Sequence, residues 1–444
     1  IINGMCALSA RFSAAPIFDG IPVKDRGTPF AQRAMFIYQE APKDEEFNSA
    51  ELSHLQGCIL LAFYYQTASA NSKSWLLTGA CCRIAYDLGL NTVDEDIINA
   101  AESRETIHIS AEDWVHREEL RRAWWSIWEL DAFASTVSCK PYSINQTRMH
   151  VFLPVSDANW FSEKPIESTH LGEVPLTTWK SLQLSQNQDE RAWFLVCNCL
   201  LKQAHELGQR HKIPTQARKD LETALACFSL TLPPQFHLNS PSLVFNDANY
   251  SKNNWIIATN LLLQGARIYC FRMKGNESSS LSHANDSVAP SGDASLNRDK
   301  STHEYRQYVQ EMLRAVKVWS PEYIALCSPF IVCSLLGPAS LVIKDSHEIS
   351  AEGQMVELAI ARFASYWNLG SLMLSMARFI ALFCLKPGLL YTLIGFTNQI
   401  QKLLVVFLLL TRARMRHMRH RRKRFRSASR LSYPLRLKSQ MSRA

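Results

Sequence analysis

Apolar residues recur every three or four positions along most of the chain, the period of a helix with one buried face. Residues 51–91 show it best, with two apolar stripes, over 52–63 and 75–88, separated by the polar run ASANS. We expect two helices packed antiparallel across a short turn. Gly89 followed by Leu90 predicts that the second helix ends in a left-handed residue, with the next apolar side chain folded back onto it.

The same period predicts a third helix over 111–135, after a polar stretch around 94–96. Residues 156–190 are polar and interrupted by prolines, so we expect a connection there. No segment alternates apolar and polar residues between hairpin turns, and the predicted fold is an all-α, multi-helix array of antiparallel helical hairpins. Further helices are expected at 190–207, 218–230, 246–273, 303–319, 330–343 and 349–378.

The chain is predicted to hold one large domain over residues 1–378. Its internal segment 275–301 is rich in Ser, Asn, Asp and Gly without an apolar period, so we expect a disordered loop. An apolar helical segment of unassigned role follows over 379–410. Residues 411–444 form a basic tail that is expected to be disordered.

The positive charge is concentrated in that tail. The whole chain carries a formal net charge of +8, but thirteen of its 48 basic residues and none of its 40 acidic residues lie between Arg412 and Arg443. The remainder therefore has 35 basic against 40 acidic residues and is mildly acidic. The basic run 419–426 is a candidate nuclear-targeting signal or phosphate contact. Its charged members are Arg419, Arg421, Arg422, Lys423, Arg424 and Arg426.

Three interpretations of the C-terminal segment remain open. Residues 387–410 have the length of a membrane span, but Lys402 lies inside and the uninterrupted apolar run 403–410 is short, so we expect no membrane association. The basic run favours nuclear targeting instead. The third interpretation is that the segment after about 379 arises from reading through a splice site.

The usual motifs of catalysis are missing from the sequence. It contains no phosphate-binding glycine loop, no G-x-S-x-G and no H-E-x-x-H. Its twelve cysteines include no C-x-x-C pair, which indicates buried reduced thiols rather than a metal site or disulfide framework. We therefore predict that the chain is not an enzyme, with no catalytic residue, no metal ligand and no cofactor of its own.

Three tryptophans, Trp124, Trp125 and Trp128, lie within the third predicted helix. Trp124 falls on the apolar stripe, so we interpret the cluster as core rather than a binding platform, and expect Trp124→Ala to destabilise the fold more than Trp125→Ala. Asp131 lies beside the stripe. It could contact an effector, but we favour a buried ion pair with Arg83 or with one of Arg121 and Arg122 that locks two helices together.

These stretches resemble the fungal-specific transcription factor domain, the middle homology region of binuclear zinc-cluster regulators. The resemblance spans residues 1–378 and is carried by four stretches in order: 4–13, 55–91 with its Asp-Leu-Gly-Leu ending, 119–144 with Arg-Arg-x-Trp-Trp, and 328–343 together with 361–374. The signature residues are Asp87, Gly89, Arg121, Arg122, Trp124, Trp125, Asp131 and Pro141. Asn145, Arg148 and His150 depart from the family, which often carries acids there.

The resemblance implies the regulatory region of an RNA polymerase II transcription factor, located in the nucleus and controlled by an effector or partner. It implies transcription machinery or co-regulators as partners, and a homodimer. It implies that DNA is bound through an N-terminal zinc-cluster module that this chain lacks, or weakly through the basic tail. Zinc is then expected only in a longer form that carries this module. The alternative is a helical ligand-binding or scaffold protein, associated with a membrane through its C-terminal segment.

Overall fold

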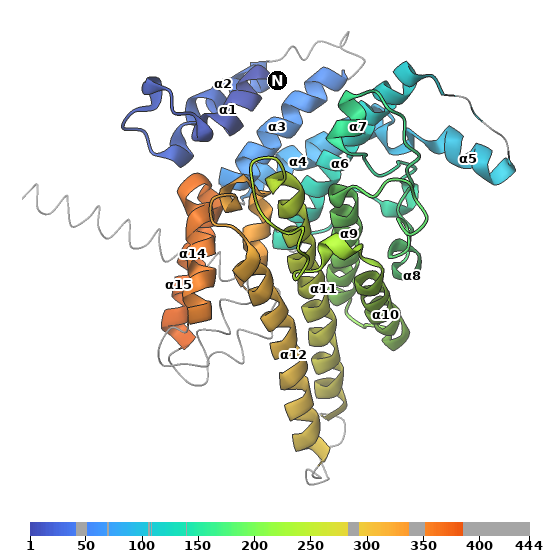
Figure 1. Ribbon diagram of the computed structural model, residues 1–444, viewed down its shortest axis with the longest axis vertical. Coiled ribbons are helices and arrows are strands. Elements are labelled where there is room, and N and C mark those ends of the chain that lie inside the picture. The colour runs from blue at the N-terminus through green and yellow to red at the C-terminus, as the bar shows by residue number, and fades with distance from the viewer. Residues whose placement is uncertain are drawn as a thin grey trace, which may run out of the picture. The chain divides into compact units, whose positions relative to one another are not determined.

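The computed structural model describes most of the chain (Figure 1). Outside the description lie residues 41–50, 69–70, 105–106, 108, 139, 283–292, 337–350 and 385–444, and side chains are not described for 275–302 and 379–384. The described residues, up to Cys384, belong to one compact unit. Within the described ranges the regular structure is helical, apart from a single antiparallel bridge between Phe152 and His170, so the all-α prediction is confirmed.

The N-terminal half supplies shorter helices around three long ones, α3, α4 and α6. Its α-helices are α1 (Ile2–Ser9), α2 (Thr28–Glu40), α3 (Leu52–Ala68), α4 (Ser72–Asp87), α5 (Glu95–Ser103), α6 (Ala111–Ser138), α7 (Asp157–Phe161) and α8 (Pro175–Thr178). Helices α3 and α4 pack on each other, and both pack on α6. The expected hairpin is therefore present, with α6 laid against it.

Both ends of α4 follow from the sequence. Asn71 accepts a hydrogen bond from the Ser74 amide, and the Ser74 hydroxyl lies within bonding distance of the Asn71 amide, which makes a capping box. Gly89 has φ +67°, in the left-handed region as predicted. Leu90 is buried behind it. The helix α5, in contrast, begins inside the polar stretch 94–96 and was not predicted.

The C-terminal half is built on long helices. Its α-helices are α9 (Glu190–Gly208), α10 (Thr215–Thr231), α11 (Tyr250–Ser282), α12 (Asp293–Val318), α14 (Ala351–Tyr366) and α15 (Asn368–Cys384). Helix α11 packs on α9, α10 and α12, which lie beside it in Figure 1. Helices α11 and α12 both extend into the expected loop 275–301, and its central residues 283–292 lie outside the described part.

The single helix expected over 349–378 is wrong: α14 and α15 form a hairpin, broken at Trp367. The turn is tight because Gly370 packs directly on the end of α14. A Cβ on Gly370 would lie 2.5 Å from the Ala364 amide nitrogen, closer than real Cβ atoms approach. Because apolar residues continue on both sides of Trp367, the hydrophobic pattern alone does not predict that the chain reverses direction there.

The prediction of an α-helix over 330–343 is also wrong for the residues of this range that the structure describes. Residues Pro329–Leu335 form the 3-10 helix η8, and 337–350 lie outside the description. Pro329, Val332 and Leu335 are all buried, a three-residue spacing that suits a 3-10 helix. Another 3-10 helix, η7 (Ile324–Leu326), precedes it.

The C-terminal hairpin, α14 and α15, packs against the N-terminal part of the chain. Helix α15 contacts α3, and the Arg11 guanidinium donates from Nη1 to the Tyr366 carbonyl at 2.9 Å while lying 3.8 Å from the centre of the Trp367 ring. Among the described helices none is long and apolar enough to cross a membrane. The segment 387–410 and the basic run 419–426 lie outside the description, so those interpretations stay predictions.

Candidate functional site

The signature helix α6 holds its tryptophans in the core. Trp124, Trp125 and Trp128 are each at most 1% exposed, as the core interpretation requires. Trp124 meets the Tyr86 ring edge-on at 5.5 Å, and the Trp125 indole donates to the Phe152 carbonyl at 2.7 Å. Trp125 is as deeply buried as Trp124 and has an added hydrogen bond, which removes the basis for ranking Trp124→Ala as the more damaging change.

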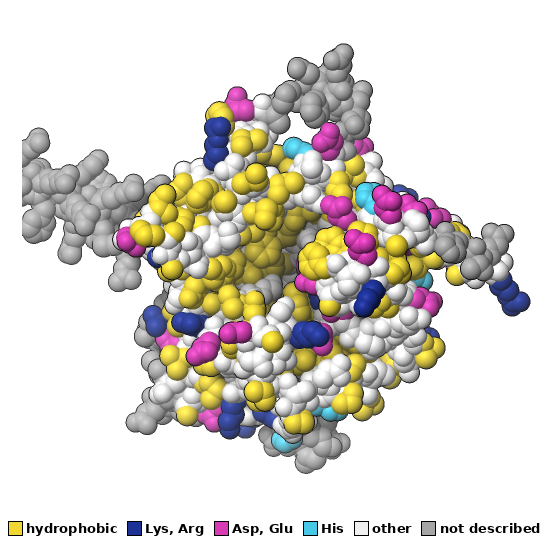
Figure 2. Space-filling model, turned by 45° about the horizontal axis from the view of Figure 1, so that its top comes forward, with side chains coloured by type: hydrophobic (Ala, Val, Ile, Leu, Met, Phe, Trp, Pro, Cys, Tyr) yellow, Lys and Arg dark blue, Asp and Glu magenta, His cyan; other side chains and the backbone are white. Residues whose placement is uncertain are grey.

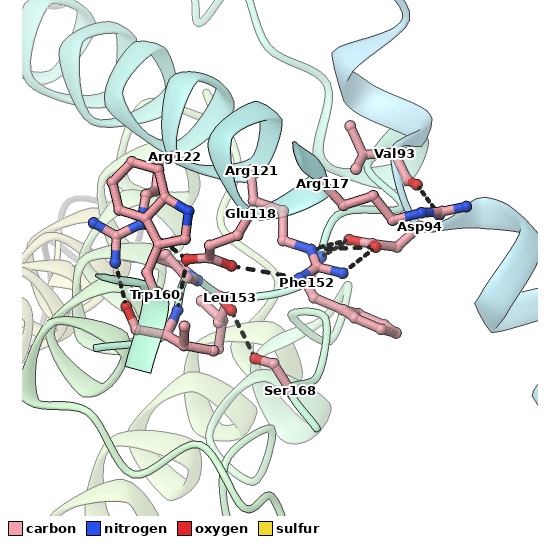
Figure 3. Close-up of polar contacts among 12 residues, drawn as sticks. Val93, Asp94, Arg117, Glu118, Arg121, Arg122, Phe152, Leu153, Trp160 and Ser168 are labelled. Carbon is pink, nitrogen blue, oxygen red and sulfur yellow. Dashed lines mark hydrogen bonds and ion pairs between the residues drawn. The ribbon is translucent and has the colours of Figure 1, made fainter. Parts of the chain in front are cut away.

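Arg121 is buried on α6 and pairs with Asp94, the residue directly before α5 (Figure 3). Its Nη2 lies 2.6 Å from Asp94 Oδ1 and its Nε 2.9 Å from Asp94 Oδ2. Burial alone lowers the pKa of Arg121, but its bonds to Asp94 and Glu118 outweigh burial and raise that pKa. The Phe152 amide also donates to Asp94 at 2.8 Å.

Glu118 extends this network to the second arginine (Figure 3). Arg122 Nε lies 3.0 Å from Glu118 Oε1, which also accepts from the Val155 amide at 3.0 Å. Arg122 donates to the Val155 carbonyl at 2.7 Å and pairs with Asp157. Burial raises the pKa of Glu118 against the opposing effect of both arginines. These bonds therefore hold the segment 152–157 against α6, and their role is structural.

The ion pair expected for Asp131 is wrong. Asp131 is buried, but its carboxylate accepts from the backbone amides of Ser143 at 2.9 Å and Ile144 at 3.0 Å. Arg83 is exposed, and the two arginines of the signature are engaged as described above. Burial raises the pKa of Asp131, while hydrogen bonds from the two amides act in the opposite direction. The carboxylate thus fixes the chain after the turn.

The remaining signature residues lie at helix ends and turns. Pro141 is exposed, and its carbonyl accepts from the Ser135 hydroxyl at 3.2 Å. Asp87 is the exposed last residue of α4, directly before the Gly89 turn. The signature residues are thus spread over α4, α6 and the turn after α6, and they do not converge on one pocket.

A separate cavity of about 470 Å³ lies where the N-terminal helices meet the C-terminal ones. Figure 2 shows a hollow with mainly hydrophobic walls on the face it presents. The volume falls in the range of small-molecule sites. Its walls come from α1, α3, α6, α9, α11, the turns η1 (Ala10–Phe12), η7 and η8, and Trp367.

One ion pair lies in this apolar wall. Arg191 at the start of α9 donates from Nη2 to Glu129 Oε2 on α6 at 3.1 Å. Glu129 Oε1 and Arg191 Nε are shielded from solvent and have no hydrogen-bond partner. Burial raises the pKa of Glu129, and the Arg191 charge opposes that shift. The cavity therefore combines aromatic and aliphatic walls with one ion pair.

The described residues bring together no metal-binding group of three His, Cys, Asp or Glu side chains. The ten cysteines whose side chains the structure describes are free. Burial raises the pKa of Cys58 to about 11 and that of Cys199 to about 12, so these thiols stay protonated at neutral pH and are poor nucleophiles.

Sequence reasoning missed Asp94, Glu118, Glu129 and Arg191. The sequence marks Asp94 only as part of the polar stretch 94–96, yet its side chain is fully buried. Glu118 and Arg122 could have been found, because their i, i+4 spacing on one helix predicts a pair. Arg191 and Glu129 are 62 residues apart, and no local pattern links them.

Comparisons with known proteins give the family. The family model described as the fungal specific transcription factor domain matches residues 2–264. The Tropolone cluster transcription factor tropK of Talaromyces stipitatus is 30% identical over 124 residues, which make up 28% of this chain and 21% of the relative. The Pigment biosynthesis transcriptional activator pigB of Monascus ruber is 26% identical over 178 residues, or 38% and 29% of the two chains.

A third relative carries the zinc-cluster class in its name. The Zn(2)-C6 fungal-type transcription factor FTF1c of Fusarium oxysporum is 25% identical over 177 residues, 39% of this chain and 18% of the relative. The matches thus cover less than a third of each of these relatives. No solved structure matches. Because the family model covers more than half of the 444 residues, from α1 into α11, the chain belongs to the fungal-specific transcription factor domain family.

Proposed function

We propose that this chain is the regulatory region of a zinc-cluster RNA polymerase II transcription factor, and that it acts in the nucleus on transcription machinery or co-regulators. The family match and relatives named as transcriptional regulators support this role. Its task is regulation without catalysis, and a homodimer is part of the proposal.

DNA contact in this proposal is made by a zinc-cluster module outside the 444 residues, where the zinc also binds. The name of the Fusarium oxysporum relative supports such a module. The basic run 419–426 supplies nuclear targeting and weak phosphate contact.

One observation carries the regulatory part of the proposal, namely the cavity between α3, α6 and the C-terminal turns. Its walls include Phe63 and Leu130 from the family-matched part and Phe330 and Trp367 from beyond residue 264. A small molecule bound there would contact both parts at once. Binding that favours one arrangement of the two parts shifts the population toward it, as effector control requires.

The role is tested by fusing the 444-residue chain to an unrelated sequence-specific DNA-binding module and measuring transcription of a reporter in a fungal host. We expect the fusion to change reporter output relative to the module alone. Output equal to that of the module alone, from a fusion of matched abundance found in the nucleus, would contradict the proposal.

The targeting part is tested separately by microscopy of the tagged chain. Changing the six basic residues of 419–426 to glutamine should move the chain out of the nucleus. An unchanged nuclear signal would remove the role of the basic run and leave the regulatory role standing.

A further inference from the structure

We propose that the cavity binds an uncharged, largely apolar ring compound, which it recognises through contact with its aromatic walls rather than through charge. This inference rests on the proposed function, because it names the class of ligand for the same cavity.

Polar side chains of the wall direct their donors into the protein. The Ser126 hydroxyl donates to the Arg122 carbonyl at 2.7 Å, and the Trp367 indole donates to the Ala325 carbonyl at 3.1 Å. A hydroxyl and an indole each have a single N–H or O–H to donate, so both of these donors are already used. What Trp367 presents to the cavity is therefore its ring.

The charges of the wall cancel each other. Among the lining residues that the structure describes, only Glu129 and Arg191 are charged, and their Oε2 and Nη2 atoms lie 3.1 Å apart. A ligand carboxylate attracted by the guanidinium would be repelled by the carboxylate beside it, and a ligand ammonium would meet the reverse. Either ion would lose its hydration on entering without a net charge to compensate it. The site therefore selects against charged compounds.

Four rings of the wall form a surface that is already in place. The Phe63 ring lies 5.0 Å from Phe330 and 6.2 Å from Trp367, and Phe12 lies 6.3 Å from Trp367. Phe330 also stacks on Phe133 of α6 at 3.9 Å. Rings held by such neighbours lose little freedom when a ligand binds, and a ring compound can pack on them in stacked or edge-to-face arrangements.

The hollow in Figure 2 is mainly hydrophobic, which adds a driving force that does not depend on ring geometry. Each apolar surface removed from water contributes roughly 25 cal/mol per Å². Burial of an apolar ligand is therefore favourable along the whole wall, and the rings supply the preference for a ring compound.

Two fluorescent probes with one ring skeleton test the ligand class. N-phenyl-1-naphthylamine is uncharged, and 8-anilinonaphthalene-1-sulfonate is the same skeleton with an added sulfonate. Each is titrated into the full chain and followed by its fluorescence. We expect the uncharged probe to bind the cavity at least tenfold more tightly, because the sulfonate would lose its hydration there without compensation.

Variants of the wall identify the binding that occurs in the cavity. Ser126→Phe places a ring in the cavity from α6, and Leu326→Asp places a charge at a lining residue that is 43% exposed. Each should weaken binding of the uncharged probe at least tenfold. Leu76→Asp, at an exposed position of α4 outside the lining, is the matched control and should leave binding unchanged. Thermal unfolding establishes that the variants are folded, and the exposed Leu326 position keeps the test available should Ser126→Phe unfold the chain.

Two further variants separate the contribution of the rings from that of the ion pair. Phe63→Leu keeps an apolar wall but removes one ring, and should weaken the uncharged probe by about threefold to tenfold. The double variant Glu129→Leu/Arg191→Leu removes both charges together, so that neither is left buried and unpaired. It should not weaken binding of the uncharged probe.

The outcomes separate the two proposals. Only binding that the two wall variants remove is assigned to the cavity, which sets aside sulfonate bound elsewhere. Cavity binding of the sulfonate as tight as that of the uncharged probe, an unchanged affinity in Phe63→Leu, or a loss of affinity in the double variant would overturn the ligand class and keep the cavity as the effector site. No saturable binding of the uncharged probe, or binding that both wall variants leave intact, would overturn the inference, and the reporter fusion would still test the regulatory role.

Discussion

Two buried carboxylates on α6 illustrate how positions on one helix take different kinds of partner. Glu118 pairs with two arginines and a backbone amide, whereas Asp131 bonds backbone amides and a hydroxyl. The sequence shows that a carboxylate beside an apolar stripe needs a hydrogen-bond or charge partner to offset the cost of burial, but it does not show which group is that partner. A backbone amide carries no sequence signal, so the true partners of Asp131 could not be named from residue types.

We predict that Asp131→Ala lowers the free energy of unfolding by about 3 kcal/mol, because it leaves the Ser143 and Ile144 amides without their acceptor. Asp131→Asn keeps one acceptor oxygen and should cost about half as much. Chemical denaturation measures both. Asp87→Ala at an exposed position is the control, and a loss for Asp131→Ala as small as the control's would contradict the account.

His205 makes stability depend on pH. Burial, followed by the nearby charge of Lys202, lowers the pKa of His205 to about 4 from its ordinary 6.5, and its Nδ1 lies 2.7 Å from the Tyr142 hydroxyl. The folded chain therefore favours the neutral ring. This contribution is fully present above pH 6.5 and is lost as the pH falls toward 4, where the unfolded chain binds the proton more readily.

The test compares the chain with His205→Gln, which cannot titrate. The stability advantage of histidine over glutamine should shrink by about 2 to 3 kcal/mol between pH 7 and pH 4.5, an order-of-magnitude figure from the shift. A difference in unfolding free energy that stays constant over this range would contradict the burial of a neutral His205.

At the scale of elements, the sequence predicted helices well where caps and turns mark them. Asn71 begins α4 and Gly89 follows its end, and both features lie in the local sequence. The reversal at Trp367 was missed because apolar residues continue on both sides of it. The close packing that requires Gly370 forms only when α15 folds back on α14, so it is a tertiary feature.

Gly370→Ala should destabilise the fold by about 2 to 4 kcal/mol, because the new Cβ would overlap backbone atoms of Phe363 and Ala364. Gly79→Ala in α4 is the matched control, since a Cβ there meets nothing within 4 Å. That control should stabilise the fold by about 0.5 to 1 kcal/mol. Thermal unfolding of both variants checks the pair, and similar small effects would refute the tight turn.

At the scale of the folded unit, segments that are far apart in the sequence together form the walls of the cavity. Arg11 bonds a carbonyl 355 residues away, and the walls combine α1 with turns near 325–330. The all-α fold and the family could be predicted, because helical periods and four ordered stretches are local. The cavity could not, because residues from five α-helices and three 3-10 turns meet there only after folding.

The central claim is that this cavity controls the regulatory output of the chain. Its most direct test is reporter transcription from the tethered chain carrying Ser126→Phe, with Ser103→Phe on the exposed face of α5 as the matched control. At equal abundance and thermal stability, filling the cavity should change reporter output by at least about fivefold, the lower end of typical coupling between sites. Output indistinguishable from the control would contradict the account.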